Sequence, residues 1–469
     1  MNPRNLRDYT SPDACPAEKP RLEDMSAETV GLHGAIDAAM KRSGLAYLHP
    51  EGETLQLDLL GSPRMIAWQE SKAQRVFEGE ECWSGLSQVY ARYGTETTRA
   101  LLEKVREWEG GARAAVLTDC GMEACALLFD VLLRRGQHAI LMRQVYNKTK
   151  KYLERLLEQL DGTSLTVVDD GDYPALEKAI RPETSIVFAE TYTNPLMRAV
   201  DPERLGGLIE AARDGGAKKL RLIVDSTIAT PWSLRRPLLS FPGVDFVVAS
   251  GTKALAGADR DLWGYIASNR VDALNEVMDL QAMRGGILDW RRARVIADGL
   301  DKARRRFEQR CGTATEVADF LSRHSRVSEV FHPSLPDHPD LATVDRHYSL
   351  SGSLMSFRIA GADEDETRDF CDVLATTVVP RYALSFDGLA TKLNHHLTVS
   401  EYFTPVEELE RAGIDRLVRL GVGLEAAEDI IACLNWALWH YKDVPAEDVA
   451  RWRRDRAREL GIYPEAPEA

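Results

Sequence analysis

Lys253 ends the segment Ser250-Gly251-Thr252-Lys253, which directly follows the apolar run Val244–Ala249. An amine at the end of a buried strand is partly removed from water, which favours its neutral, nucleophilic form. The hydroxyls of Ser250 and Thr252 can donate hydrogen bonds to a phosphate. Together these groups predict a lysine that holds pyridoxal 5′-phosphate (PLP) as a Schiff base. Taken alone, the four residues favour an ordinary surface turn, because short motifs occur often by accident.

A second apolar run, Leu222–Val224, ends in the carboxylate of Asp225. PLP withdraws electrons only while its ring nitrogen stays protonated, and a buried acid beside that nitrogen enforces the protonation. The alternative is that Asp225 caps the helix that follows. Since neighbouring parallel strands end at the same edge of a sheet, Asp225 and Lys253 together predict one site.

The segment Cys120-Gly121-Met122 links the apolar run Ala114–Leu117 to a helical pattern, Met122–Leu133. A glycine at a helix start lets free backbone N–H groups approach an anion, and the helix dipole adds attraction. This turn is therefore the predicted main phosphate site, which the hydroxyls of segment 250–253 complete. In isolation the motif is weak, because many strand–glycine–helix turns bind nothing.

Two more strand ends carry candidates. Asn194 follows the run Thr184–Ala189 and could donate to the phenolic oxygen of PLP, or serve as a turn residue before Pro195. Tyr146 follows the run His138–Leu141 and could stack on the cofactor ring or protonate a leaving group. An aromatic residue near a strand end is more often part of the core.

These candidates follow a regular alternation of helical patterns and short apolar runs that begins near Arg99. Apolar strands joined by crossover helices form a mostly parallel sheet, whose ligands bind beyond the carboxyl ends of the strands. The expected class is therefore α/β. The predicted strands span 114–117, 138–141, 164–168, 184–189, 220–224 and 244–249, and the predicted helices span 99–108, 122–133, 148–159 and 202–213.

Three regions divide the chain. Residues 1–85, which are mixed and rich in Pro and Glu, are the predicted N-terminal arm, and residues 86–305 are the predicted large PLP-binding domain. Its last part, a polar helical zone from 271 to about 324 with repeated arginines, is interpreted as a solvated connecting helix. Residues 306–469 are the predicted small α+β domain, with strands at 353–359 and 417–422 and a helix from 426.

The composition argues against several classes of protein. A net charge of −14 disfavours nucleic acid or an anionic membrane as the main partner. The seven cysteines are scattered singly without a Cys-x-x-Cys pair, which predicts neither a disulfide framework nor a zinc site and favours a reducing compartment. No metal is expected. Because the N-terminus has no apolar signal segment and no apolar run is long enough to span a bilayer, the sequence predicts a cytoplasmic protein.

The candidates resemble, in order, the motifs of the Cys/Met-metabolism family of PLP enzymes, which includes cystathionine γ-synthases, cystathionine lyases, methionine γ-lyases and acylhomoserine sulfhydrylases. The resemblance runs from about Tyr90 to Leu438. Tyr90-Ala91-Arg92 resembles the family's Tyr-x-Arg, Cys120-Gly121-Met122 its Ser-Gly-Met, Glu190–Pro195 its Glu-Thr-Pro-x-Asn-Pro and Val224–Pro231 its Val-Asp-Asn-Thr-Phe-Ala-Thr-Pro. Segment 250–253 is similar to Ser-x-Thr-Lys, and Leu417–Glu425 to Leu-Val-Arg-Leu-Ser-Val-Gly-Leu-Glu.

The resemblance implies a PLP-dependent transferase fold of type I with a seven-stranded sheet. It also implies a homotetramer, a dimer of dimers, whose active sites are shared between subunits. Tyr90 and Arg92 would reach the PLP phosphate of a neighbouring subunit, and Thr227 is implied as a further cofactor-binding residue. Arg419 would grip the α-carboxylate of an amino acid substrate, a role that also suits a planar, bidentate cation at the end of an apolar strand. Ser385 resembles the serine of the family's Ser-Leu-Gly turn beside that carboxylate.

The departures from the family concern the substrate side. Asn147-Lys148-Thr149 follows Tyr146 where the family has small residues, Ala254–Asp261 replaces a Tyr-x-x-Gly-His-x-Asp segment, and Gly421 replaces a serine. The residues expected around the cofactor are kept, whereas those expected around the substrate are changed. This pattern predicts a non-standard amino acid substrate.

The predicted reaction is γ-elimination or γ-replacement on a γ-substituted L-amino acid, with Lys253, Tyr146 and Asp225 as the catalytic residues. Arg419 fixes the substrate carboxylate, Lys253 moves the protons and Tyr146 supplies a proton to the leaving group. Four alternatives stay open. They are a sulfur amino acid γ-synthase or sulfhydrylase, a β-lyase, γ-elimination of a halogenated unsaturated amino acid to an alkyne in secondary metabolism, and an aminotransferase.

Overall fold

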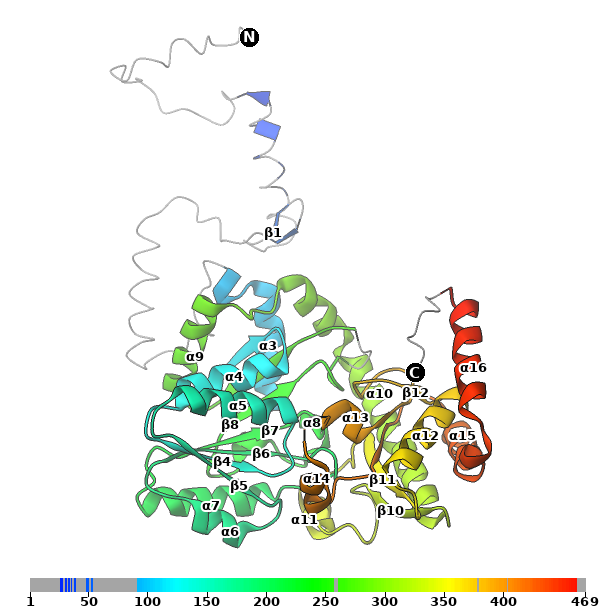
Figure 1. The fold of residues 1–469 in the computed structure, drawn as a ribbon. Helices are drawn as coiled ribbons and strands as arrows, with labels where there is room; N and C mark the ends of the chain where they lie inside the picture. The colour runs from blue at the N-terminus through cyan, green and yellow to red at the C-terminus, as the bar shows by residue number, and fades with distance from the viewer. Residues whose placement is uncertain are drawn as a thin grey trace, which may run out of the picture.

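The structure is a computed structural model that describes residues 91–461 apart from 257–259, 378 and 403, together with a few positions between 26 and 53. Most of the predicted N-terminal arm and all of Tyr90 therefore lie outside the described residues. Within the arm, β1 (Leu48–His49) pairs antiparallel with β2 (Gly52–Glu53). Figure 1 shows two lobes, a large sheet with helices on both sides and a smaller lobe that carries the C-terminal helices.

The large sheet has seven strands. In spatial order they are β3 (Ala114–Thr118), β9 (Gly264–Ser268), β8 (Val244–Ser250), β7 (Arg221–Asp225), β6 (Thr184–Glu190), β4 (His138–Met142) and β5 (Ser164–Val168). β9 runs antiparallel to β3 and β8, and the other pairs run parallel. This is the predicted mostly parallel α/β architecture, with all six predicted strands present and β9 in addition.

Both faces of this sheet are covered, because successive side chains of its strands point to opposite faces and most of them are apolar. Helices α4 (Gly121–Leu132), α5 (Asn147–Gln159) and α9 (Val271–Arg284) pack on the face that includes Phe188. Helices α3 (Glu96–Trp108), α6 (Tyr173–Ala179), α7 (Pro202–Asp214) and α10 (Trp290–Arg323) cover the face that includes Val187. Figure 1 shows α4 and α5 on one side of the strands and α6 and α7 on the other.

The helical zone predicted from 271 to 324 is two helices, since Gly285 and Gly286 have φ angles of 104° and 75° between α9 and α10. α10 belongs to both lobes, because Ala293 lies in the core of the large sheet and Leu321 in the core of the small one. The arginines at 291, 294, 304 and 305 are exposed, as predicted for a solvated helix, but the opposite side of α10 is buried. The predicted domain boundary between 305 and 306 falls inside this helix.

The small lobe has a five-stranded sheet. In spatial order its strands are β10 (Val327–Phe331), β11 (Leu354–Ile359), β14 (Val418–Gly421), β13 (Lys392–His395) and β12 (Arg381–Tyr382). Its core also takes side chains from α10, α12 (Glu364–Leu374), α15 (Ala427–His440) and α16 (Ala446–Glu459). The remaining helices are α8 (Thr230–Ser233), α11 (Leu341–His347), α13 (His396–Ser400) and α14 (Val406–Ala412). None of the described helices is long and apolar enough to cross a membrane.

Candidate functional site

Lys253 and Ser385 meet across the two lobes, although they are 132 positions apart in the sequence. Lys253 follows β8 in a turn held by two hydrogen bonds, from Thr252 N to Trp263 O at 3.1 Å and from Trp263 N to Thr252 Oγ1 at 3.1 Å. The Lys253 amine donates a hydrogen bond to Ser385 Oγ and lies 4.9 Å from the centre of the Phe386 ring. The structure thus joins the predicted Schiff-base lysine to a residue predicted beside the substrate carboxylate.

Asp225 lies at the carboxyl end of β7, next to β8. It does not cap a helix, since α8 begins only at Thr230; its Oδ1 instead accepts a hydrogen bond from Thr227 N at 2.8 Å. Burial raises the pKa of Asp225 to about 6, and hydrogen bonds from Thr227 oppose that shift. No lysine, arginine or histidine in the described part of the chain pairs with this carboxylate. A cation supplied by a ligand would therefore be strongly favoured beside it.

Glu190, which has no predicted role, adds a second buried carboxyl group at this edge. It pairs in register with Asp225 between β6 and β7, and its Oε1 accepts a hydrogen bond from Tyr146 N at 2.6 Å. Burial, with the nearby charge of Asp225, raises the pKa of Glu190 well above its usual value. Tyr146 stands at the start of α5 with 46% of its surface exposed, so it is not a core residue. Glu190 thus holds the backbone from which this aromatic ring projects.

The N-terminus of α4 packs directly against the end of β8. A Cβ atom on Gly121 would lie 2.5 Å from Ser250 Cβ, so the close approach requires glycine. Ser250 N donates to Thr227 Oγ1 at 2.8 Å, which ties the end of β8 to the loop after β7. Cys120, Gly121, Ser250 and Thr227, all predicted to bind the cofactor, therefore surround the free backbone N–H groups of one helix start.

Gly121→Ala should weaken both folding and cofactor binding, because the added Cβ forces α4 away from Ser250. Overpacking of this kind costs about 1–3 kcal/mol, and we expect about tenfold weaker PLP affinity. Calorimetry and equilibrium dialysis measure the two effects. Gly207→Ala in α7 is the matched control, since nothing lies within 4 Å of its Cβ position. A Gly121→Ala protein that melts and binds like the wild type would contradict this packing.

Arg419 lies on β14 and is only 4% exposed. Its Nη1 donates to Asn194 Oδ1 at 3.2 Å and its Nη2 to Leu384 O at 3.4 Å. Both acceptors are uncharged, and Arg419 has no carboxylate partner in the described part of the chain. Burial lowers its pKa to about 10, while Tyr146 and Glu401 oppose that shift. Arg419 is thus a buried cation without a paired anion, beside the turn that carries the predicted carboxylate-site serine.

The other predicted residues differ in how the structure places them. Asn194 precedes a cis peptide bond to Pro195, and because its Oδ1 accepts from Arg419, its Nδ2 stays a donor for the predicted bond to PLP. Met122 Sδ accepts a hydrogen bond from the Thr149 hydroxyl at 3.7 Å on the far side of the α4 start. Arg92 is exposed in the short helix η4 (Ala91–Tyr93).

A buried ion pair supports the turn that carries Ser385. Arg310 of α10 is fully buried; its Nη1 donates to Gly388 O at 2.8 Å and its Nη2 lies 3.6 Å from Asp387 Oδ1. Asp387 has a φ angle of 61° and accepts a hydrogen bond from Ser353 Oγ at 2.6 Å. It stands where the resembling family has the glycine of Ser-Leu-Gly. Nothing in the sequence marks this pair, because Arg310 lies among arginines that are mostly exposed.

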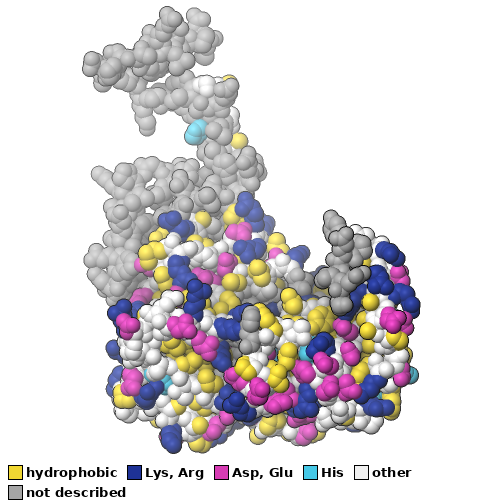
Figure 2. Space-filling model, in the orientation of Figure 1, with side chains coloured by type: hydrophobic (Ala, Val, Ile, Leu, Met, Phe, Trp, Pro, Cys, Tyr) yellow, Lys and Arg dark blue, Asp and Glu magenta, His cyan; other side chains and the backbone are white. Residues whose placement is uncertain are grey.

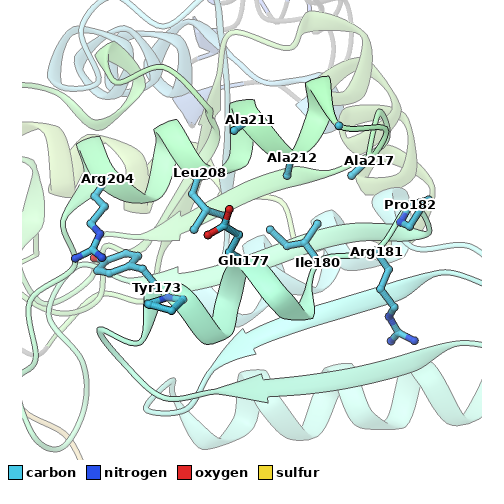
Figure 3. A pocket seen from close by; sticks show the side chains of 12 residues that line it. Tyr173, Glu177, Ile180, Arg181, Pro182, Arg204, Leu208, Ala211, Ala212 and Ala217 are labelled. Atoms are coloured by element: carbon cyan, nitrogen blue, oxygen red, sulfur yellow. The ribbon is translucent and has the colours of Figure 1, made fainter.

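A cavity of about 460 Å³ lies between α6 and α7. Figure 3 shows Arg204 beside the Tyr173 ring at one end, and the guanidinium lies 4.3 Å from the ring centre. Glu177 and Leu208 line the middle of it. None of the residues around this cavity is a predicted site residue, so it is distinct from the candidate site. No group of three potential metal ligands is placed to hold an ion among the described residues.

Comparisons with known proteins agree with this arrangement. The family model described as Cys/Met metabolism PLP-dependent enzyme matches residues 68–439. The chain belongs to this family. It is 33% identical over 352 residues to cystathionine gamma-synthase 1, chloroplastic, of Arabidopsis thaliana, covering 74% of this chain and 60% of that relative. It is 30% identical over 410 residues to L-methionine gamma-lyase of Fusobacterium nucleatum, covering 85% of this chain and 99% of that relative.

A solved structure of a related enzyme has a similar fold. The crystal structure of cystathionine gamma-lyase from Lactobacillus plantarum complexed with L-serine matches with a TM-score of 0.69 and 26% identity, over 76% of this chain and 90% of that one. The family is PLP-dependent, so PLP is the cofactor. The site fits it, because the α4 start packed on Ser250 suits a phosphate, the half-buried Asp225 suits a cationic ring nitrogen and the Lys253 amine suits an aldehyde.

The raised pKa of Asp225 predicts a pH effect on the PLP-free enzyme. A carboxyl group that titrates near 3.8 in the unfolded chain and about 6 in the fold binds more protons when folded, so its contribution to stability falls as pH rises from about 4 to 6. The loss is roughly 3 kcal/mol. Asp225→Asn should abolish this pH-dependent loss of stability. The variant's free energy of unfolding in urea, relative to wild type, should therefore grow by that amount over this pH range. A difference independent of pH would contradict the buried state of Asp225.

Proposed function

We propose that this enzyme catalyses γ-elimination, or γ-replacement, on a γ-substituted and non-standard L-amino acid. The observation that carries the proposal is Arg419, a buried guanidinium without a carboxylate partner among the described residues, held by Asn194 next to the Lys253–Ser385 contact. A buried cation is costly unless an anion neutralises it. An amino acid substrate supplies that anion as its α-carboxylate and supplies its amine toward the cofactor site.

PLP, when bound, accepts the electron pair that is left when a bond at the substrate Cα breaks. Every other part of the proposed reaction is assigned to the chain. Arg419 orients the substrate through a bidentate contact with its carboxylate. Lys253 Nζ takes the Cα proton and later returns a proton, because a neutral amine at this position is a suitable base. Asp225 stays anionic opposite the ring nitrogen.

The γ-step removes one Cβ proton and breaks the bond from Cγ to its substituent X. Tyr146, exposed at the start of α5 and held by Glu190, would supply or relay the proton that lets X leave as HX. In elimination, water then releases a 2-oxo acid and ammonium. In replacement, a thiol or other nucleophile adds at Cγ, and the net exchange is X for that nucleophile.

A mass-spectrometric screen tests the proposal. The purified holoenzyme is incubated with amino acids that carry a thioether, an ester or a halide at Cγ, with and without an added thiol. We expect loss of the γ-substituent from at least one class, and a new thioether when replacement prevails. Matched β-substituted substrates identify a β-lyase, and a halogenated unsaturated substrate that yields an alkyne identifies the third alternative. Pyridoxamine phosphate and a 2-oxo acid without loss of X would show an aminotransferase and overturn γ-chemistry.

We also propose that the enzyme is a homotetramer whose active sites are shared between subunits, and that it works in the cytoplasm. The family resemblance of Tyr90 and Arg92 supports the shared site, and the exposed position of Arg92 leaves it accessible to a neighbour. The described cysteines are free thiols, which agrees with a reducing compartment. An active monomer in solution would reject the shared site.

A further inference from the structure

The segment after α13 brings a carboxylate beside Tyr146. Asn147 Nδ2 donates to Glu401 Oε2 at 2.9 Å and to Ser400 O at 2.9 Å. The Thr404 hydroxyl donates to the same oxygen of Glu401 at 2.7 Å. Asn147 follows Tyr146 at the start of α5, so these bonds fix Glu401 across from the large sheet at the boundary of the lobes. Asn147 is one of the residues that departs from the small residues of the family.

Glu401 also lies close to Arg419 without pairing with it. α13, which ends next to Glu401, follows β13, and β13 pairs with β14 so that Asn394 lies opposite Arg419. The charge of Glu401 reaches the guanidinium, but no ion pair joins the two side chains within 4 Å. A carboxylate as well as a guanidinium therefore lies near the start of α5.

One oxygen of the Glu401 carboxylate, Oε1, accepts no hydrogen bond from the described residues. Both of its protein donors bind Oε2, and no lysine or arginine in the described part of the chain forms an ion pair with it. The nearby lysines are engaged elsewhere: Lys148 Nζ lies 5.7 Å from the centre of the Tyr402 ring, and Lys150 Nζ lies 4.0 Å from Glu408. Oε1 is thus available as an acceptor, and its charge is not cancelled by a contact.

The surroundings add negative charge. α14 follows this segment and exposes Glu407, Glu408 and Glu410. Figure 2 shows Asp and Glu side chains gathered on this face around α14. A ligand that enters beside Tyr146 therefore meets Arg419, which suits its α-carboxylate, and several acidic side chains further out. Like charges placed together at a partly desolvated site cost several kcal/mol, which is a common source of specificity.

We propose that Glu401 selects the substrate by charge: amino acids whose γ-substituent is uncharged, or carries a hydrogen-bond donor, bind productively, and those whose γ-substituent carries a carboxylate or phosphate are rejected. The inference rests on the proposed function in one respect, the assignment of Arg419 to the α-carboxylate. With Arg419 occupied, a second anionic group on the substrate meets Glu401, since the nearby Lys148 and Lys150 lie against the Tyr402 ring and Glu408. Neutral esters, thioethers and halides do not incur this repulsion.

The test uses two amino acids that lack any leaving group. L-norleucine and L-2-aminoadipate have chains of equal length and differ in a terminal methyl against a terminal carboxylate. Each is titrated into the holoenzyme, and the change in cofactor absorbance gives its Kd. We expect wild type to bind norleucine at least about tenfold more tightly. Glu401→Gln, which keeps an acceptor for Asn147 and Thr404, should tighten aminoadipate binding about tenfold and leave norleucine within about twofold.

Glu407→Gln is the matched control, because it removes the same charge from the exposed side of α14. Its ratio of the two Kd values should stay within about twofold of wild type, since solvent and salt screen that position. An unchanged ratio in Glu401→Gln, an equal change in Glu407→Gln, or a wild-type preference for aminoadipate would each overturn the inference.

A turnover measurement separates this inference from the proposed function. O-acetyl- and O-succinyl-L-homoserine break the same bond, and only the second carries an extra carboxylate. We expect a higher kcat/KM for the acetyl ester than for the succinyl ester. Glu401→Gln should reduce this difference in kcat/KM. If neither ester reacts while the norleucine preference and its loss in Glu401→Gln persist, charge selection stands and γ-elimination of esters fails. If both esters react equally well in wild type and variant, γ-chemistry stands and charge selection fails.

Discussion

Lys253→Ala should abolish turnover and leave PLP without a covalent attachment. The Lys253 amine is the group that the turn after β8 presents toward Ser385, and its removal takes away both the Schiff-base nitrogen and the proposed base. A positioned general base alone contributes about 10²–10⁴-fold, so we expect kcat/KM to fall by at least about a thousandfold. The visible absorbance of the bound cofactor should disappear with it. Spectroscopy of the purified variant measures the second effect directly.

Borohydride reduction locates the attachment in the wild type. Reduction turns the Schiff base into a stable secondary amine, and peptide mapping should then find the cofactor's mass on the peptide that contains Lys253. Lys178→Ala is a suitable control, because Lys178 is exposed in the last turn of α6 and far from the ends of β7 and β8 in sequence. That variant should keep the absorbance, the tag and the activity. A tag on another lysine, or none, would remove Lys253 from the reaction.

The strands of the large sheet could be predicted because burial on both faces leaves a local signal. β4 and β8 are mostly apolar runs, and a run of that kind is typical of a parallel strand. The sequence does not predict β9, because its local signal is weak. Only a short apolar stretch lies in Gly264-Tyr265-Ile266-Ala267-Ser268, between small and polar residues. Its five residues are fully buried, but its neighbours β3 and β8 are what place it there.

The predicted cofactor residues Asp225 and Lys253 could be placed together from the sequence because each follows a predicted strand. Asp225 and Lys253 needed no tertiary information beyond the rule that parallel strands end at one edge. The substrate side did not follow. Asn147 and Glu401 are 254 positions apart, and Arg310 and Gly388 are 78 apart, so their contacts arise only in the tertiary structure. Neither residue type nor spacing marks such pairs in advance.

Those long-range contacts explain why one family fold accepts new substrates. The turn from Ser385 to Gly388 is hydrogen-bonded to the buried Arg310, and the segment around Glu401 is hydrogen-bonded to Asn147 of α5. Both segments can therefore change in sequence without moving β14. Arg419 stays fixed by the register of β11, β14 and β13. The residue proposed to select the substrate thus lies on a connection, and the residue proposed to bind the carboxylate lies on a central strand.

Arg419→Met should weaken amino acid binding without destabilising the substrate-free enzyme. Truncating one partner of a buried charge pair costs about 2–5 kcal/mol, which corresponds to about 30- to 5,000-fold in kcat/KM, expressed mainly as a higher KM. In the free enzyme the buried guanidinium has no carboxylate partner within the described part of the chain, and burial lowers its pKa to about 10. Methionine fills a similar volume without a charge, so the unfolding temperature should stay equal or rise.

Arg358→Met provides the contrast. Arg358 lies on the neighbouring strand β11 and already has carboxylate partners, Glu329 and Asp415. Its loss should lower the unfolding temperature and leave KM unchanged, the reverse of the effect at Arg419. Arg419→Lys should fall between wild type and Arg419→Met in KM, because lysine keeps the charge but lacks the planar fork that binds both carboxylate oxygens. An Arg419→Met enzyme that melts at a lower temperature with an unaltered KM would show that Arg419 has a structural role. A residue that binds substrate destabilises the substrate-free fold, whereas a residue that supports folding stabilises it.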